Sequence, residues 1–154
     1  MRPARGAMTP PKPRLVGINH VALEVGDLEH ALEFYGSVFE LREIDREPGM
    51  AFIEMEDQFL ALSERSGGPP DGARHFGLVV DDKPAARAAL EAHGAEILPG
   101  PRLDFRDPWG NHIQVVDYRD IQFTKAPQVL EAMRLGDVEK RPSAIEELRA
   151  RGLA

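Results

Sequence analysis

The sequence contains no cysteine, which excludes a disulfide bond and any thiolate metal site. This absence suits a reducing compartment, so we expect a cytoplasmic protein. Long apolar runs are also absent, and none approaches the roughly 20 residues of a membrane span. The proline-rich start lacks the apolar segment of a signal peptide. We therefore expect no membrane partner.

Acidic side chains outnumber basic ones outside the N-terminal segment. The chain has 154 residues and a net charge of −7. Its first fourteen residues carry four basic side chains and no acid, so the remainder carries −11. An acidic body argues against nucleic acid as a partner. We expect residues 1–14 to form a disordered basic arm, or to precede a true start at Met8.

The chain contains an internal repeat. HVALEVGDLEHALEFYG, from His20, aligns with HFGLVVDDKPAARAALE, from His75. Each copy reads as a strand, an aspartate at a helix N-cap (Asp27 or Asp82) and an amphipathic helix, the second of which should end at Gly94. Further strands are expected at Arg42–Arg46, Met50–Glu56 and Phe59–Ser63, and again at Glu96–Leu98, Leu103–Arg106 and His112–Asp117.

This pattern predicts an α+β fold. Two paired β-α-β-β-β modules, residues 15–66 and 72–118, should form one cup-shaped mixed sheet within a single domain, 15–118. Residues 119–154 should add a helical C-terminal extension. Pro127 suits the first turn of one helix, and Ser143 with Glu146 fits a capping box for another. The apolar stripes of these helices need a surface, either on the same chain or on a second subunit.

Strand alternation places the polar side chains. In the first strand Val21, Leu23 and Val25 can pack under the helix, which leaves His20, Ala22 and Glu24 on the opposite face. His75 takes the equivalent position in the second module. If the halves pair about a pseudo-twofold axis, both imidazoles point into one cup.

The last strand of the second module carries a polar pair on one face. It follows a tight turn, DPWGN, in which we expect Trp109 to be a surface residue. His112 and Gln114 share one face, while Ile113, Val115 and Asp117 share the other. The first face is expected to meet the two repeat-equivalent histidines.

INHVALEVGDLEHALEFY, RHFGLVVDD and DFRDPWGNHIQVV together resemble the vicinal oxygen chelate superfamily, over about residues 16–118. That group includes glyoxalase I, extradiol dioxygenases, fosfomycin-resistance transferases and bleomycin-binding proteins. The resemblance implies a cup around a divalent metal (Zn, Fe, Mn or Ni), with ligands from the first and last strands of each module. It assigns metal ligation to His20, His75 and Gln114, the last standing where the family has glutamate.

Two further positions depart from the family patterns. Ala61 stands where glyoxalase I has a carboxylate ligand. Asp104 stands where extradiol enzymes tend to carry tyrosine, which weakens the case for ring cleavage. A glutamine carbonyl can coordinate a metal but brings no charge, so metal affinity should fall and a bound substrate should be polarised more strongly. Glu24 or an anionic substrate would supply the missing charge. Alternatively, the site holds no metal and Gln114 hydrogen-bonds a ligand or water.

The leading functional hypothesis is a metalloprotein that activates a small oxygen-bearing substrate, as a lyase, an isomerase or a dioxygenase. Candidate catalytic residues are Gln114, His112 and Glu24, although His112 also fits a rim position beside the turn. The alternative is a metal-free protein that sequesters an aromatic antibiotic, for which ten aromatic residues are a modest supply. We expect a homodimer, because open sheets leave edges that need covering.

Overall fold

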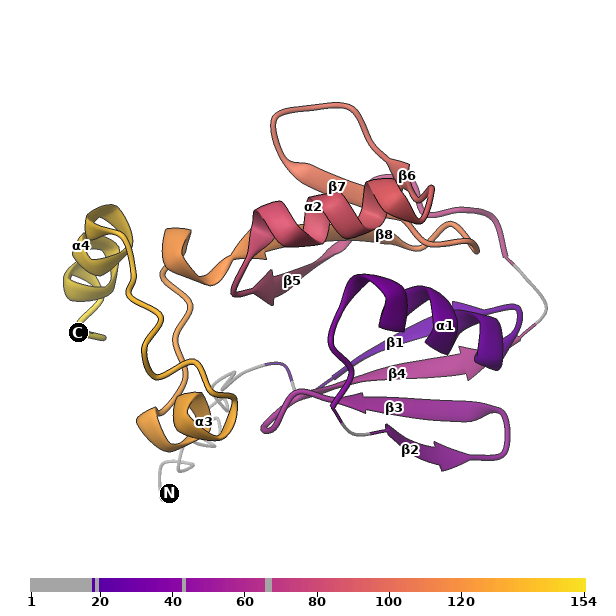
Figure 1. Ribbon diagram of the computed structural model, residues 1–154, viewed down its shortest axis with the longest axis horizontal. Coiled ribbons are helices and arrows are strands. Elements are labelled where there is room, and N and C mark those ends of the chain that lie inside the picture. The colour runs from indigo at the N-terminus through magenta and orange to yellow at the C-terminus, as the bar shows by residue number, and fades with distance from the viewer. Residues whose placement is uncertain (1–17, 19, 43, 66–67) are drawn as a thin grey trace, which may run out of the picture.

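The computed structural model describes residues 18, 20–42, 44–65 and 68–154; the expected basic arm at 1–14 lies outside them. The first module comprises β1 (His20–Val25), α1 (Leu28–Val38), β2 (Ile44–Glu47), β3 (Met50–Glu54) and β4 (Phe59–Glu64). The second comprises β5 (Phe76–Val80), α2 (Lys83–Ala92), β6 (Glu96–Ile97), β7 (Leu103–Arg106) and β8 (His112–Asp117). The predicted β-α-β-β-β repeat is confirmed (Figure 1).

Each module forms its own four-stranded mixed sheet. The strand orders are β1-β4-β3-β2 and β5-β8-β7-β6. The first and last strands of each module pair in parallel, because the intervening helix carries the chain back across the sheet. The other pairs are antiparallel. The edge strands are therefore β1 and β2 in the first sheet and β5 and β6 in the second. β7 and β8 have the predicted bounds, while β2 begins later than expected, at Ile44.

The two long helices form where the sequence places their caps. Asp27 accepts a hydrogen bond from the His30 backbone nitrogen at 2.7 Å, and Asp82 accepts one from Ala85 at 2.9 Å. α2 ends just before Gly94, whose φ of +66° is the left-handed conformation that glycine adopts without strain. Both predicted caps and the predicted helix end are confirmed.

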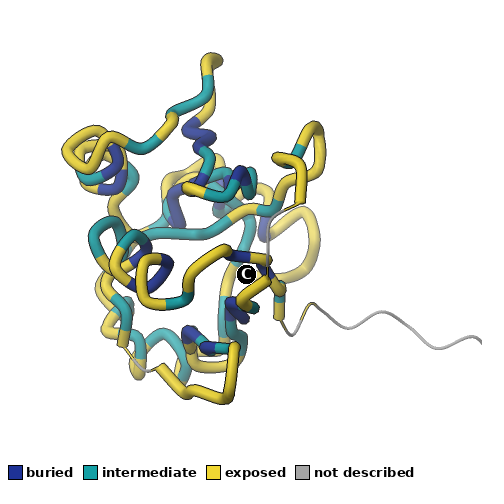
Figure 2. Tube along the Cα trace, turned by 90° about the vertical axis from the view of Figure 1, so that its right-hand side faces the viewer, coloured by how far each residue is buried: buried dark blue, intermediate teal, exposed yellow. Residues whose placement is uncertain are grey.

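The core follows the alternation of the strands. Leu23 and Val25 of β1 are buried, and Ile113 and Val115 of β8 are completely so. They belong to one apolar cluster that includes residues of both helices and both sheets. Figure 2 shows the buried residues in dark blue along the trace. The alternate positions on β1 and β8 are left on the other face of each sheet, where a ligand can reach them.

Asp107, in the turn before β8, ties the second module to the first. Its buried carboxylate accepts hydrogen bonds from the Tyr35 hydroxyl of α1 at 2.9 Å and from the backbone nitrogens of Trp109 and Asn111 at 3.0 and 2.8 Å. The Asn111 side chain also donates to this carboxylate, at 2.7 Å, and to the Glu24 carbonyl of β1, at 2.9 Å. The turn is thus a polar joint between the modules.

The expectation that Trp109 is a surface residue is wrong. Its ring is half-buried against the core cluster and meets the His30 ring edge-on, with centroids 5.3 Å apart. A side chain at Gly26 would place its Cβ 2.5 Å from Trp109 Nε1. The turn lies against the first module instead of facing solvent, so the indole occupies part of the space between the modules.

Tyr35 should make the fold less stable at alkaline pH. Burial, reinforced by the Asp107 carboxylate, raises the pKa of Tyr35 well above its ordinary value of 10.0. Above pH 10 the unfolded chain releases a proton that the folded protein keeps. The contribution of Tyr35 to the free energy of unfolding should therefore be level below pH 10 and fall above it. Urea unfolding from pH 7 to 11 should show this decline in the wild type. An equal decline in Tyr35→Phe would assign it to another group.

The extension contains η1 (Tyr118–Asp120), α3 (Pro127–Ala132) and α4 (Pro142–Ala150). α3 begins at Pro127 as expected. The predicted capping box at Ser143 is wrong, because α4 begins one residue earlier, at Pro142, which suits the first helical position, and has no side-chain cap. Ala144 and Leu148 are buried, and α4 lies against η1, so this helix finds its surface on the same chain.

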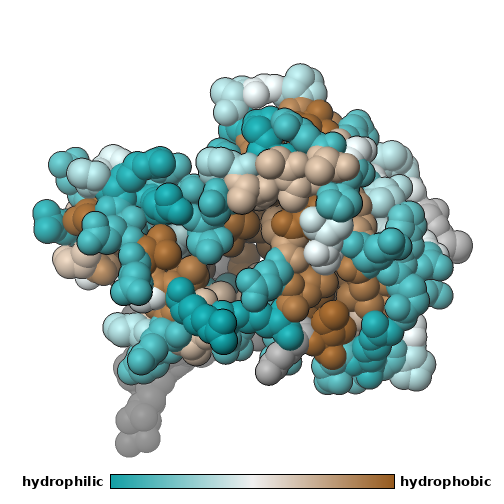
Figure 3. All heavy atoms as spheres, viewed as in Figure 1, coloured by the Kyte–Doolittle hydropathy of each residue, from teal (hydrophilic) through white to brown (hydrophobic). Residues whose placement is uncertain are grey.

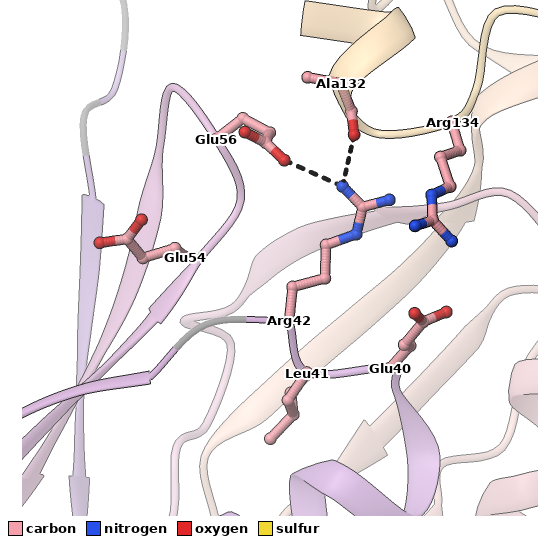
Figure 4. Close-up of a pocket in the computed structure, with 7 residues that line it drawn as sticks. All are labelled: Glu40, Leu41, Arg42, Glu54, Glu56, Ala132 and Arg134. Atoms are coloured by element: carbon pink, nitrogen blue, oxygen red, sulfur yellow. Dashed lines mark hydrogen bonds and ion pairs between the residues drawn. The ribbon is translucent and has the colours of Figure 1, made fainter.

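The extension also reaches the first module. Arg42 donates to the carbonyls of Ala132 and Met133 at the end of α3, both at 2.8 Å, and to Glu56 at 2.9 Å (Figure 4). A cation at a helix C-terminus complements the helix dipole. Lys125 binds Asp57 in the turn between β3 and β4. In the view of Figure 3, the surface is hollowed between the extension, at left, and the two modules. The extension, which begins directly after β8 of the second module, is thus tied to the first module as well.

Candidate functional site

The open face of the second module carries the densest group of candidate residues. Gln114 of β8 lies opposite Gly77 of β5 on one side and opposite Asp104 of β7 on the other. The rings of His75 and His112 stack, with centroids 4.9 Å apart and planes at 30°. The structure thus brings together His75, His112 and Gln114, as the alternation predicted, and adds Asp104.

The His75 ring is oriented by a backbone contact. Its Nδ1 lies 3.0 Å from the Ala73 carbonyl oxygen. A carbonyl only accepts, so Nδ1 must carry the hydrogen and Nε2 keeps its lone pair. Metal-binding histidines are typically held this way by an outer hydrogen bond, which fixes both tautomer and ring orientation. His75 is therefore prepared to ligate through Nε2.

Asp104 and His112 face each other without a hydrogen bond. Asp104 Oδ1 and His112 Nε2 lie 3.8 Å apart, and each side chain is 12% exposed. Both atoms are buried, and neither has a partner among the described residues. The other carboxylate oxygen of Asp104 lies 3.5 Å from Arg102 Nε. Unpartnered buried atoms of this kind call for a proton, a water or an ion between them.

The sequence held a signal for Asp104 that the family comparison obscured. Leu103 and Phe105 are completely buried, so strand alternation alone puts Asp104 on the face opposite the core. An aspartate there, one strand from Gln114, is a candidate for binding. The family resemblance presents Asp104 only as a departure from a tyrosine pattern.

His20, on β1 of the first module, lies apart from the stacked rings of His75 and His112. Its ring stacks on Phe59, with centroids 4.7 Å apart. Asn111, just before His112, contacts Glu24, four residues beyond His20. A strand rises about 3.3 Å per residue, so His20 lies about 13 Å along β1 from the level of His75 and His112. In Figure 1 the arrows of β4 and β5 point in opposite directions. Because β4 is parallel to β1, the strands β1 and β5 also run in opposite directions.

No three histidine, cysteine, aspartate or glutamate side chains of the described residues converge as a ready metal site. Ala61 is buried, opposite Ala22 of β1, and offers no ligand atom. Glu24 is exposed, and its carboxylate lies 4.0 Å from Arg65 Nε. By its spacing along β1 from Glu24, His20 of one chain is expected to lie apart from His75 and Gln114 of the same chain.

A cleft of about 510 Å³ lies between the modules beside His75. Residues 21–26 of the first module line one wall, including Glu24. His75, Phe76 and Trp109 line the other. Both modules therefore contribute side chains to a space that a small ligand can enter. No helix among the described residues has the length and apolar character to cross a membrane.

Comparison with known proteins agrees with this architecture. Residues 17–115 match the family model of the Glyoxalase/Bleomycin resistance protein/Dioxygenase superfamily. This match covers more than half of the chain, and the chain belongs to that superfamily.

Solved structures share the fold. The fosfomycin resistance protein FosX from Mesorhizobium loti is 18% identical with a TM-score of 0.58, over 66% of this chain and 91% of that one. FosX from Listeria monocytogenes, complexed with Mn(II) and sulfate, is 17% identical with a TM-score of 0.59, over 78% and 99%. A glyoxalase/bleomycin resistance protein from Albidiferax ferrireducens is 19% identical with a TM-score of 0.56, over 65% and 97%.

Proposed function

We propose that the protein is a metal-dependent enzyme that acts on a small oxygen-bearing molecule at the open face of its second module. His75 and Gln114 hold the metal there, and His20 from a second copy completes the set. The observation that carries this proposal is the His75 ring, whose Nδ1 is tied to the Ala73 carbonyl so that Nε2 remains available one strand from Gln114. Superfamily membership supports it.

The donors on this face fit a divalent transition metal. Imidazole nitrogen with amide and carboxylate oxygen suits zinc, iron, manganese or nickel, and the chain has no thiolate to favour softer ions. When bound, such a metal supplies Lewis acidity that polarises the oxygen atoms of a chelating substrate. The structure of FosX from Listeria monocytogenes, which is complexed with Mn(II), supports this assignment.

The position of His20 motivates a homodimer. At about 13 Å along β1 from the level of His75, it is too far away to share a metal within one chain. A two-fold axis that brings His20 of one copy to His75 of the other does so twice, and builds two equivalent sites. Neither site is then complete in a monomer.

His112 and Glu24 are the proposed proton-handling and substrate-orienting groups. His112 stacks on His75, so its ring borders any molecule bound at Nε2 of that residue. Glu24 lines the cleft that His75 also lines, so its carboxylate can hold a polar group or supply charge near a cation. Gln114 lies on the same face of β8 as His112 and orients the substrate by its amide when it does not ligate.

A second candidate function is metal-free binding of an aromatic molecule. The cleft between the modules favours it, because Phe76 and Trp109 lie in its wall beside apolar side chains of β1. Aromatic faces of this kind stack on planar ligands. Metal titration separates the two candidates.

His75→Ala should weaken metal binding about a hundredfold or more, because losing a direct ligand should exceed the 10–100-fold typical of an outer-shell partner. Protein freed of metal by chelation would be titrated with Mn(II) and Zn(II) in a calorimeter. His93→Ala is the matched control, since His93 is an exposed histidine at the end of α2. Wild-type protein that takes up no metal would contradict the proposal and leave the binding-protein alternative.

Mixing two defective variants tests the shared site. In a mixed dimer of His20→Ala and His75→Ala, one site loses both histidines and the other keeps both. Metal affinity should therefore return for one site per mixed dimer, although each variant alone is defective. A monomer by light scattering, or mixing without recovery, would show that His20 is not part of the site.

A further inference from the structure

Two unpartnered atoms lie between β7 and β8. Asp104 Oδ1 and His112 Nε2 are shielded from solvent and have no hydrogen-bond partner among the described residues. A carboxylate oxygen and an imidazole nitrogen left in this state carry an uncompensated desolvation cost unless something joins them. Their separation of 3.8 Å is too long for a direct hydrogen bond.

We propose that Asp104 and His112 are metal ligands, and that Asp104 supplies the carboxylate that position 114 lacks. The second module then offers two imidazoles and one carboxylate, from His75, His112 and Asp104, with Gln114 beside them. This inference rests on the proposed metal on this face and changes which side chains hold it.

The distance between the two atoms suits a shared cation. Ligand atoms that each lie about 2.1 Å from one metal are between about 3.0 and 4.2 Å apart, for angles from 90° to 180° at the metal. The observed 3.8 Å lies within this range. An ion between Asp104 and His112 would satisfy both atoms without moving either strand, because β7 and β8 are held in register by backbone pairing.

The third ligand needs only a side-chain movement. The His75 ring already stacks on the ring of His112, and His75 is exposed, so its ring can leave the Ala73 carbonyl and turn Nε2 toward the same point. No three such side chains converge in the described residues as they stand, and this rotation is the missing step. Gln114, opposite Asp104, would border the ion with its amide oxygen.

The local charges favour a cation at this place. The carboxylate converts a neutral set into the two-histidine, one-carboxylate arrangement that leaves open positions for substrate. Arg102 is the nearest competing cation, 3.5 Å from the other oxygen of Asp104, but its side chain is 60% exposed and weakly held. Arg106, opposite His112, donates to the carbonyls of Asp71 and Gly110 and is thereby directed elsewhere.

Asp104→Asn tests the assignment with the full-length protein and with Co(II) and Mn(II) as probes. We expect affinity to fall about 10- to 100-fold and the visible spectrum of bound Co(II) to change, because the ligand field loses a carboxylate. Asp104→Glu keeps the charge and should retain more affinity than Asp104→Asn. Asp45→Asn, which makes the same charge change on exposed β2, should leave both readouts unchanged.

The outcomes separate this inference from the proposed function. Loss of metal in His75→Ala together with wild-type affinity and an unchanged Co(II) spectrum in Asp104→Asn and His112→Gln would overturn the inference alone. In that case the two residues form an ion pair, and Asp104→Asn should instead lower the melting temperature of the metal-free protein. Absence of metal uptake by the wild type would overturn both proposals.

Discussion

Gln114→Glu is expected to tighten divalent-metal binding about tenfold or more while it destabilises the metal-free protein. The substitution is nearly isosteric and replaces a dipole by a full negative charge beside a divalent ion. A tenfold gain corresponds to about 1.4 kcal/mol. Without metal, the new carboxylate stands opposite Asp104 across the β7–β8 pair, where like charges repel.

The two effects have opposite signs in one variant, which makes the result easy to interpret. Metal titration by calorimetry would give the affinity, and thermal melts with and without metal would give stability. The metal-induced rise in melting temperature should be larger in Gln114→Glu than in the wild type, since tighter binding to the folded state adds stability. A variant with no gain in affinity and a lowered melt would mean that Gln114 lines a ligand pocket through its amide hydrogens.

Asp107→Ala should produce the largest loss of stability, about 3–5 kcal/mol. The buried carboxylate serves Tyr35 of the first module and the Trp109 and Asn111 backbone nitrogens of its own turn. Its removal leaves several buried donors without an acceptor, each at a cost of about 1–3 kcal/mol, with partial relief from water. Urea unfolding measures the loss.

Two comparisons locate the source of that loss. Tyr35→Phe removes only the bond between the modules and should cost less than Asp107→Ala. Asp137→Ala, at an exposed aspartate between α3 and α4, should leave stability within about 0.5 kcal/mol of wild type. If Asp107→Ala unfolds with the free energy of the Asp137 control, the joint between the modules does not contribute to stability.

Strand alternation and helix caps were enough to predict each module. The apolar positions of β1 and β8 specify which face meets the core, and Asp27 and Asp82 specify where the helices begin. These signals are local, because each involves residues a few positions apart. The same alternation predicts that His75, His112 and Gln114 share one face, and the structure brings these residues together.

The remaining features depend on contacts that no local pattern encodes. Trp109 is half-buried because the first module happens to lie beside its turn. Arg42 holds α3 across 90 positions of sequence. The separation of His20 from His75 follows from the antiparallel placement of two modules, and the repeat alone leaves that placement open. The approach of Asp104 to His112 depends on the register in which β7 pairs with β8, which the sequence does not specify.

Two of the four edge strands, β2 and β6, affect how this protein can associate with itself. All four residues of β2 are exposed, three of them charged, and Arg46 is paired with Glu29 of α1. β6 has only two residues. Short or charged edges are poor templates for the backbone pairing by which sheets grow from one molecule into the next. Open-ended fibre growth along the β2 and β6 margins is therefore disfavoured.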